Sequence, residues 1–356
     1  MRAIAAPAPT TVPAGLDHEE LAVRRGERSG VTMAIAVHST RLGPALGGAR
    51  LWHYERDDDG IADALRLAEA MTYKAAAAGL DLGGGKGVIC APAHEPPQGE
   101  FRRAILHDFG DLVESLDGRY ITAEDVGTAT EDMVEIATRT THVTGMPVER
   151  GGAGDPSPFT AAGVQAAMRA ACVRAFGTND LAGRSVAVVG LGHVGERLAR
   201  GLATAGARLT VADIDPAKRD VGDELDAEWL EPYAALVAPR DVVAPCAVGG
   251  VIHAGNLGAL RCRVVCGAAN NQLAEDGLAD ELVRRGIVYA PDFIANAGGL
   301  INVYRELHSY DAERAMALVL RIEAVMTDVF EHAAAAGVTP LEAARALATR
   351  RLDVSE

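Results

Sequence analysis

The sequence predicts an α/β protein with two domains, in which a mixed-sheet domain precedes a doubly wound parallel-sheet domain and the C-terminal helices pack back on the first. Three observations support this prediction. The chain has 356 residues, which is long for one core and sufficient for two. Strand-like and helix-like segments are mixed in its first part. From about residue 184, short apolar runs alternate with helical stretches, as is typical of a parallel sheet.

In the first part, residues 31–37 ("VTMAIAV") and 119–123 ("RYITA") have the composition of strands. Between them, residues 61–79 have helical spacing and end at a glycine. Thr128 and Glu131 have the spacing of a capping box that would start a further helix. Asp125, in "AEDVG", is therefore expected where a strand ends and a helix begins. Residues 1–16 contain several prolines and are expected to form a loose tail.

The second part contains five apolar runs that are expected to be parallel strands: "SVAVVG", "RLTVAD", "DVVAPC", "RVVCGA" and "IVYAPD". A long amphipathic helix and a shorter one follow. We expect residues 1–146 and about 325–356 to form the first domain, which binds substrate and carries the oligomer contacts. Residues 147–324 are expected to form the nucleotide-binding domain.

Composition limits the partners. The formal charge of -15 would repel nucleic acid, and no basic cluster is present. The five cysteines are odd in number, scattered and mostly in apolar runs, which favours reduced thiols and a cytoplasmic location. No segment has the length of a membrane span. We expect a small-molecule substrate and no metal ion.

The stretch "GLDLGGGKGV", residues 79–88, resembles a phosphate-binding loop only at first sight. A P-loop needs a glycine where this chain has Leu80 and a hydroxyl residue where it has Gly87. Nucleotide binding here is improbable, so Lys86 needs another explanation. A glycine run without side chains would let a small substrate approach the backbone; the alternative is that Lys86 is a plain surface loop lysine.

"GLGHVG" follows an apolar run and opens a helical stretch, which is the context of a dinucleotide fingerprint made by Gly190, Gly192 and Gly195. Asp213 ends the next apolar run, where a carboxylate can bind the adenosine ribose and repel a 2′-phosphate, so NAD is favoured over NADP. His193 and Val194 would lie beside the cofactor, with His193 at the solvent edge. In the alternative interpretation, the glycines only form a tight turn and Asp213 only caps a strand.

Three charged residues form a candidate catalytic set. Lys74 shares a helical stripe with the apolar residues Leu67 and Met71, which is costly unless an anion binds. Lys86, if buried near a second lysine, would have a depressed pKa and could act as a base. Asp125 could carry a second proton. Alternatively, Lys74 reaches solvent from a helix end and Asp125 is a turn residue.

Eight stretches together resemble one known family, the glutamate, leucine, phenylalanine and valine dehydrogenases, with the leucine and valine branch most similar. They are "LGPALGGAR", "MTYKAAAAGLDLGGGKGVI", "RYITAEDVGT", "ERGGAGDPSPFTAAGV", "GLGHVG", "APCAVGGVI", "CGAANNQLA" and "YAPDFIANAGGLINV". They extend from about residue 31 to the C-terminal helices. The resemblance implies reversible, NAD-dependent oxidative deamination of an L-amino acid and a Rossmann fold for the second domain.

The resemblance also implies roles for single residues. Lys74 would bind the substrate α-carboxylate, Lys86 would be the acid/base acting through water, and Asp125 would exchange protons with the amino nitrogen. Asn270 would orient substrate and nicotinamide ribose. Thr160 and the backbone at Cys246 and Ala247 would hold the nicotinamide carboxamide. Asn270 and Thr160 could instead cap local turns.

The expected side-chain pocket is apolar. Glutamate enzymes of the family have a lysine at the position of Leu46 and a serine at that of Val303, so glutamate should be rejected here. The remaining lining implied by the resemblance is Gly43, Met71, Ala123 and Leu300. Leu300 is bulkier than the expected valine. The prediction is a branched-chain substrate (leucine, valine or isoleucine), with phenylalanine as an alternative.

Two other classes compete with an amino acid dehydrogenase. A 2-hydroxy acid dehydrogenase would use arginine and histidine in place of the lysine pair. A catalytically silent NAD-binding regulator would have lost at least one of Lys74, Lys86 and Asp125. The family resemblance further implies a homo-oligomer, dimer or octamer, assembled through the first domain.

Overall fold

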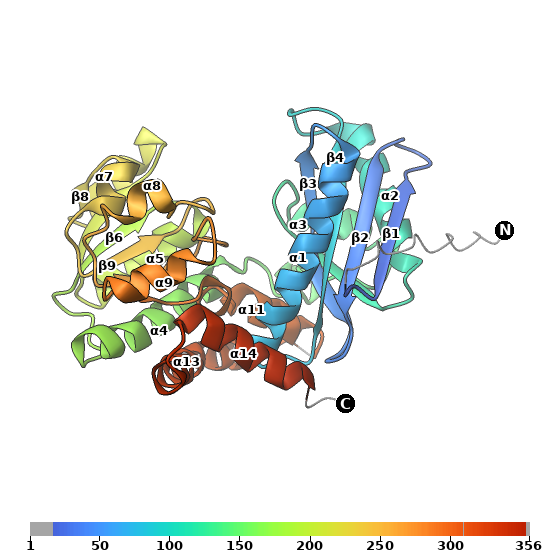
Figure 1. The fold of residues 1–356 in the computed structure, drawn as a ribbon. Coiled ribbons are helices and arrows are strands. Elements are labelled where there is room, and N and C mark those ends of the chain that lie inside the picture. Colours follow the sequence, from blue (N-terminus) through green and yellow to red (C-terminus); the bar gives the residue numbers. More distant parts are fainter. Residues whose placement is uncertain (1–16, 309, 354–356) are drawn as a thin grey trace. The chain divides into compact units, whose positions relative to one another are not determined.

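The computed structural model describes residues 17–308 and 310–353, which divide into two compact units (Figure 1). The first unit comprises the described residues up to Asp155, Val303–Tyr310 and the chain from Thr349. The second comprises Pro156–Asn302 and Asp311–Ala348. The predicted N-terminal tail, residues 1–16, lies outside the described residues.

The first unit is built on a five-stranded mixed sheet with the order β1-β2-β4-β3-β5. Strands β3, β4 and β5 run parallel to one another, whereas β2 runs antiparallel to both of its neighbours, β1 and β4. In chain order the elements are β1 (Glu20–Arg25), β2 (Thr32–Ser39), β3 (Ala45–His53), α1 (Asp57–Ala77), β4 (Gly83–Ala91), α2 (Gly99–Glu114), β5 (Tyr120–Glu124), α3 (Thr130–Ile136) and the 3₁₀ turn η1 (Val148–Arg150).

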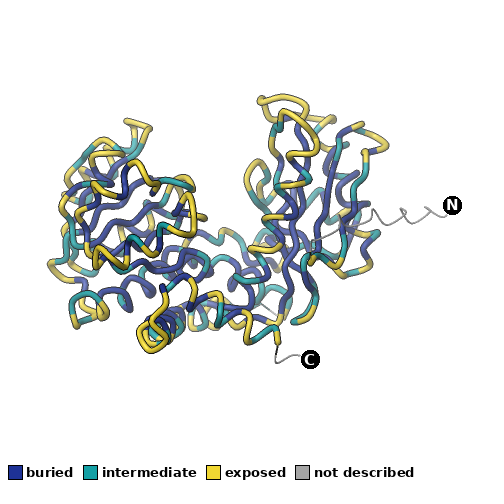
Figure 2. The backbone as a smooth tube through the Cα atoms, viewed as in Figure 1, coloured by how far each residue is buried: buried dark blue, intermediate teal, exposed yellow. Residues whose placement is uncertain are grey.

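The two faces of this sheet are covered by different helices because side chains alternate along each strand. On one face, Ala34, Ala36 and Val88 pack with Ala64 and Ala68 of α1. The residues between them in sequence point to the other face, where they pack with residues of α2 and α3. The strands are accordingly buried over most of their length (Figure 2). The predicted strands at 31–37 and 119–123 and the helix at 61–79 correspond to β2, β5 and α1.

The glycine run before Lys86 belongs to strand β4 and is not a loop. Its role is close packing: a Cβ atom on Gly84 would lie 2.1 Å from the backbone nitrogen of Thr72 in α1, and one on Gly85 would lie 2.7 Å from the ring of Tyr120. The missing side chains therefore let α1 and the Tyr120 ring approach the strand. This explanation replaces the expected approach of substrate to a glycine loop.

The second unit is built on a parallel six-stranded sheet with the order β11-β10-β9-β6-β7-β8. Its elements up to the last strand are α4 (Ser157–Phe176), β6 (Ser185–Val189), α5 (His193–Thr204), β7 (Arg208–Ala212), the 3₁₀ turn η2 (Pro216–Lys218), α6 (Arg219–Glu224), β8 (Glu228–Trp229), α7 (Pro232–Val237), β9 (Val242–Pro245), α8 (Ala254–Leu257), β10 (Val264–Val265), α9 (Leu278–Arg284) and β11 (Val288–Tyr289). All five predicted strands are present, and β8 is additional.

The chain ends in a series of helices: α10 (Asp292–Ala295), α11 (Gly298–Glu306), α12 (Ala312–Leu320), α13 (Ile322–Ala336) and α14 (Pro340–Asp353). Helices α12 and α13 pack on α4, and a Cβ atom on Gly163 of α4 would come within 2.8 Å of the Ile322 side chain. Leu341 of α14 belongs to the core of the second unit. The C-terminal helices therefore group with the second unit as far as Ala348. The expected boundary near residue 325, beyond which the chain was to pack on the first domain, is not where the two units divide.

Two later segments of the chain also belong to the first unit. From Thr349 onward α14 groups with it, and there Arg351 donates a hydrogen bond to Asp81 at 2.7 Å. Glu306 of α11 accepts hydrogen bonds from the backbone nitrogens of Gly145 and Ala153, both at 2.9 Å. These bonds tie residues 147–155 to the first unit, so the boundary lies at Asp155 and not at the expected residue 146. Among the helices within residues 17–308 and 310–353, none combines the length and apolar character needed to cross a membrane.

Candidate active site

Lys86 is a buried lysine in the middle of strand β4, with a side chain only 6% exposed. Its ammonium lies 2.9 Å from Oδ2 of Asp125. Burial lowers the pKa of Lys86 below 10.5, and this effect exceeds the opposing attraction of Asp125. The nearby positive charge that lowers the pKa further is Arg50. Lys86 is therefore not a surface lysine, and its neutral form is more accessible than that of a solvated lysine.

Asp125 follows β5 directly and points back to the sheet face that carries Lys86. Burial alone would raise the pKa of its carboxyl group, but Lys86 and Arg50 outweigh it and hold the pKa below 3.8. The turn is fixed by Thr128, whose hydroxyl accepts a hydrogen bond from the Asp125 backbone nitrogen at 2.9 Å and lies 2.8 Å from the Ala49 carbonyl. The predicted capping box at Thr128 and Glu131 is thus wrong: α3 starts at Thr130, and Asp132 accepts the bond from the Ala129 nitrogen.

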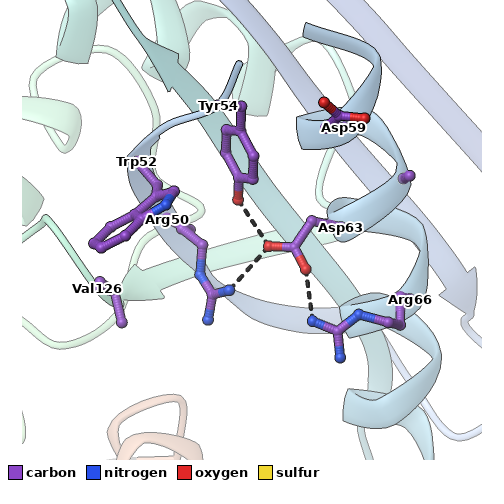
Figure 3. A pocket seen from close by; sticks show the side chains of 8 residues that line it. Arg50, Trp52, Tyr54, Asp59, Asp63, Arg66 and Val126 are labelled. Atoms are coloured by element: carbon purple, nitrogen blue, oxygen red, sulfur yellow. Dashed lines mark hydrogen bonds and ion pairs between the residues drawn. The ribbon is translucent and has the colours of Figure 1, made fainter. Parts of the chain in front are cut away.

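Arg50 connects this pair to α1, a link that the sequence analysis did not identify. Its Nε donates to Asp125 Oδ2 at 2.9 Å, and its Nη1 donates to Oδ2 of Asp63 at 2.9 Å. Asp63 also accepts bonds from Tyr54 at 2.7 Å and Arg66 at 2.6 Å (Figure 3). These residues border a cavity of about 570 Å³, whose lining is Arg50, Trp52, Tyr54, Asp59, Ala62, Asp63, Arg66 and Val126. Strand alternation could have revealed Arg50, because it shares its parity with Leu46.

The register of β3, β4 and β5 brings the predicted substrate residues of the sheet together. Leu46 pairs with Gly84, two residues before Lys86, and Gly48 pairs with Ala123, two residues before Asp125. Leu46, Lys86 and Ala123 therefore lie on the face that α1 partly covers. Leu46 is 2% exposed and Ala123 is 6% exposed. Buried apolar side chains thus lie beside the amine and the carboxylate on this face, together with Arg50.

The other predicted substrate residues lie on different elements. Met71 and Lys74 are half-buried in the last two turns of α1. Gly43 precedes β3 with φ of 143°, and its carbonyl accepts a hydrogen bond from the Gly83 nitrogen at 3.2 Å. Leu300 and Val303 are both buried in α11, but Leu300 groups with the second unit and Val303 with the first.

In the second unit, the predicted fingerprint forms the turn between β6 and α5. Gly190 has φ of 105°, and its nitrogen donates to the Ala212 carbonyl at 2.7 Å. A Cβ atom on Gly195 would lie 1.9 Å from the Gly190 carbonyl oxygen, so this glycine allows the helix to pack against the turn. Gly192 is exposed at the N-terminus of the 12-residue helix α5, and apart from its chain neighbours no described residue has a heavy atom within 4 Å of the Cβ position. The turn thus has open space where a helix N-terminus attracts anions.

The other predicted cofactor residues lie mostly at the carboxyl ends of neighbouring strands, where ligands bind in such sheets. Asp213 follows β7, and its carboxylate accepts bonds from the nitrogens of Leu191 at 2.6 Å and Asp215 at 2.9 Å. Cys246 and Ala247 follow β9. The remaining residues are His193 and Val194 in the first turn of α5, Thr160 in the first turn of α4, and Asn270, whose Oδ1 accepts a bond from Asn296 at 2.7 Å.

One group of possible metal ligands was not expected from the sequence. Ligand atoms of His53, Glu55 and His94 all lie within 4.8 Å of one another. His53 Nδ1 lies 3.0 Å from the Ala91 carbonyl, and the two histidine rings meet edge to face. The group lies at the end of β3 and takes no part in the Lys86–Asp125 pair.

A mixed-sheet unit with a buried lysine–carboxylate pair, joined to a parallel-sheet unit with a dinucleotide fingerprint, defines a two-domain dehydrogenase. Family models agree with this class. Residues 18–142 match the Glu/Leu/Phe/Val dehydrogenase dimerisation domain, and residues 210–354 match the glutamate/leucine/phenylalanine/valine dehydrogenase domain. The chain therefore belongs to the glutamate, leucine, phenylalanine and valine dehydrogenase family, and is an amino acid dehydrogenase.

Individual relatives match over nearly the whole chain. Leucine dehydrogenase from Bacillus subtilis is 46% identical over 95% of this chain and 92% of its own length. Valine dehydrogenase from Streptomyces albus is 41% identical over 94% of this chain and 92% of its own length. The crystal structure of L-tryptophan dehydrogenase from Nostoc punctiforme aligns with a TM-score of 0.82 at 38% identity, covering 95% of this chain and 97% of the other.

These comparisons confirm the predicted family resemblance and the two-domain α/β class. They give no support to the two competing classes, the 2-hydroxy acid dehydrogenase and the silent regulator. A dehydrogenase of this family implies a nicotinamide cofactor.

Proposed function

We propose that this protein catalyses the reversible, NAD-dependent oxidative deamination of a branched-chain L-amino acid to its 2-oxo acid and ammonia. In this proposal the first unit binds the amino acid and the second binds NAD. The observation that carries the proposal is the buried Lys86 ammonium, which lies 2.9 Å from Asp125 on an apolar sheet face. An amine with a lowered pKa next to a carboxylate can serve as base and acid in the same site.

The proposed roles follow from the chemistry of each group. Lys74, half-buried at the end of α1, would bind the substrate α-carboxylate. The neutral amine of Lys86 would take a proton from the water that attacks the iminium carbon. Asp125, an ionised carboxylate, would first accept a proton from the substrate ammonium and would later return it to the amino nitrogen, so that ammonia can leave the carbinolamine. The apolar surroundings strengthen these charge interactions by excluding other water.

The residues of the second unit are suited to a dinucleotide. Gly192 leaves open space at the N-terminus of α5, where a pyrophosphate could accept backbone hydrogen bonds. Asp213, beside the same turn, would accept hydrogen bonds from the ribose hydroxyls and repel a 2′-phosphate, which favours NAD. Gly190, Gly195, His193 and Val194 would surround the pyrophosphate, and Thr160, Cys246, Ala247 and Asn270 would hold the nicotinamide end. When bound, NAD would accept the hydride from the substrate Cα.

The substrate class follows from the apolar side chains of the residues expected to line the side-chain pocket. Leu46 and Val303 are 2% and 6% exposed, and a second carboxylate buried against them without a partner would cost several kcal/mol. Met71, Ala123, Gly43 and Leu300 complete the proposed lining. The relatives named above are leucine, valine and tryptophan dehydrogenases, all of which act on apolar amino acids. An aliphatic lining favours the branched-chain members.

We further propose a cytoplasmic homo-oligomer. All five cysteines are free and four of them are buried, which suits a reducing compartment. The family model that matches residues 18–142 is described as a dimerisation domain, which supports assembly through the first unit.

The proposal is tested by mixing the purified chain with NAD and single L-amino acids at alkaline pH and following the nicotinamide absorbance band. Leucine, valine and isoleucine should be oxidised, and glutamate should not. Lys86→Ala should lower kcat about 10²- to 10⁴-fold while calorimetry still detects NAD binding. Lys218→Ala, which removes a lysine paired with Glu196 in the second unit, is the matched control and should retain turnover. If no apolar amino acid is oxidised, the proposal is wrong.

A further inference from the structure

Arg50 is a charged residue of the candidate active site that binds Asp125. The family resemblance implies roles for Lys74, Lys86 and Asp125, but none for Arg50. It lies on β3, and its register partner Val88 is two residues from Lys86 on the neighbouring strand. Its side chain is 22% exposed and binds two carboxylates through two different nitrogens. Because the guanidinium is planar and rigid, two bonds to separate partners fix the orientation of both.

The two cations at Asp125 share a single oxygen. Lys86 Nζ and Arg50 Nε both lie 2.9 Å from Oδ2. Within the part of the chain that the structure describes, no hydrogen bond reaches Oδ1. One oxygen is therefore held in place by protein, and the other keeps its lone pairs.

We propose that Arg50 is a positioning residue, which holds Asp125 through Oδ2 so that Oδ1 exchanges the proton with the substrate amino nitrogen. The proposal rests on the deamination function proposed above. It assigns the proton transfer to one atom. It also explains why a second cation is needed: Lys86 must be uncharged before it can act as a base, whereas an arginine in a protein stays protonated. Asp125 therefore keeps a charged partner throughout the reaction.

Asp63 keeps Arg50 in this orientation. It accepts a bond from each of three side chains: Arg50 and Tyr54 donate to Oδ2, and Arg66 donates to Oδ1 (Figure 3). Asp63 lies on α1, so the helix that covers part of the sheet face also anchors the arginine. The chain of contacts Lys86–Asp125–Arg50–Asp63 alternates positive and negative charge.

This alternation gives the proposal a specific signature in the pH dependence. The charged groups that face Lys86 are Asp125 after β5, Arg50 on β3 and Asp63 on α1. Arg50 lowers the pKa of Lys86, whereas Asp125 and Asp63 raise it. Removing the charge of Arg50 should therefore raise the pKa of Lys86, and removing the charge of Asp63 should lower it. A loss of packing alone would not move the pKa of Lys86 in opposite directions in the two variants.

The test is the pH profile of kcat/KM for oxidative deamination in wild type, Arg50→Gln and Asp63→Asn. Both variants should lose about 100-fold in kcat, because Asp125 is no longer held in place. The apparent pKa of the base should move upward in Arg50→Gln and downward in Asp63→Asn. Arg50→Lys should keep the profile near that of wild type but not recover the rate, because an ammonium lacks the planar fork.

Arg102→Gln is the matched control. Arg102 is also 22% exposed and pairs with an aspartate, Asp132; within the described residues its other hydrogen bonds go to the carbonyls of Pro97 and Gly127 and not to Lys86 or Asp125. It should lower stability without moving the pH profile. Carbon-13 NMR of labelled aspartate provides a readout independent of turnover: the pKa of Asp125 should rise in Arg50→Gln, since Arg50 helps to lower it.

The outcomes separate the two proposals. If wild type oxidises no amino acid, the proposed function fails, and the NMR titration still tests Arg50. If wild type is active and Arg50→Gln keeps its kcat, its pH profile and the pKa of Asp125, the positioning role is overturned while the proposed function stands.

Discussion

Gly48 and Asp125 approach so closely that a Cβ atom at position 48 would lie 2.6 Å from the Cβ of Asp125. The same atom would lie 2.6 Å from the Glu124 carbonyl oxygen. Both neighbours are rigid, since one is backbone and the other is the first atom of a side chain. Because Gly48 of β3 has no side chain, Asp125 can lie over the sheet within reach of Lys86 and Arg50.

Gly48→Ala should therefore displace Asp125. The variant should lose about 100-fold in kcat/KM, because the carboxylate moves relative to Lys86, and about 1–3 kcal/mol of stability from overpacking. Steady-state kinetics and urea unfolding measure the two effects. Gly258→Ala is the control, because apart from its chain neighbours no described residue has a heavy atom within 4 Å of the Cβ position there. Full activity in Gly48→Ala would show that the carboxylate position is not decisive.

Lys86 and Asp125 can be predicted from the sequence, but the geometry that joins them cannot. Both stand in recognisable motifs, but the sequence leaves open whether Lys86 is buried or lies in a surface loop. The glycine run was interpreted as a loop, although its glycines are explained by the contacts of β4 with α1 and Tyr120, which are distant in sequence. Arg50 was missed because the link from β3 through Arg50 to Asp63 depends on the position of α1 over the sheet.

In the second unit, the strands of the sheet were easier to predict than the residues at which the unit begins and ends. Apolar runs identify buried parallel strands directly, so all five predicted strands are present. Strand β8 has two residues, Glu228 and Trp229, and is too short to give a pattern. The C-terminal helices have amphipathic faces, but a face does not specify its partner. That α12 and α13 pack on α4 follows from tertiary contacts, such as the one between Ile322 and Gly163.

Cofactor choice can be tested at Asp213. Asp213→Asn keeps an oxygen for the Leu191 nitrogen, which the carboxylate now accepts at 2.6 Å, but removes the charge. The ratio of kcat/KM for NAD over NADP should fall about 10- to 100-fold, because a charged hydrogen bond to the ribose is lost and the repulsion of a 2′-phosphate ends. Initial rates with both cofactors measure this ratio.

Asp215→Asn is the control for the cofactor experiment. Asp215 is exposed in the same loop and accepts a hydrogen bond from the Ala217 nitrogen at 3.0 Å. The substitution should leave the NAD preference unchanged. An unchanged ratio in Asp213→Asn itself would contradict the assignment of Asp213 to the ribose.

The substrate pocket can be tested by adding the charge that it lacks. Leu46→Lys combined with Val303→Ser should introduce glutamate oxidation and reduce the activity with leucine. Without glutamate, the new ammonium is buried on the same face as Lys86, so the double variant should be less stable and should recover stability when glutamate binds. Thermal unfolding with and without glutamate measures this recovery.

A conservative substitution controls for the pocket experiment. Leu46→Met keeps the volume and apolar character, so it should cost less than about 1.5 kcal/mol and retain the branched-chain preference. A stable double variant that neither oxidises glutamate nor is stabilised by it would place the substrate side chain elsewhere.

The lowered pKa of Lys86 also has a consequence for stability. Burial lowers the native pKa of Lys86 from that of a solvated lysine, which is about 10.4 and applies to the unfolded chain. Between the two values the unfolded chain binds more protons at this site than the native protein, so the contribution of Lys86 to the free energy of unfolding rises with pH. Below the native pKa the lysine is charged in both states, and the contribution is constant.

Comparison of wild type with Lys86→Met isolates this contribution, because every other titrating group is present in both proteins. The free energy of unfolding of wild type minus that of Lys86→Met, measured by urea unfolding from neutral pH to about pH 10, should increase towards alkaline pH. Lys218→Met controls for the loss of a lysine that is 34% exposed in its side chain. A difference between wild type and Lys86→Met that is independent of pH would mean that the native pKa of Lys86 is not lowered, and would remove the basis for its role as the base near neutral pH.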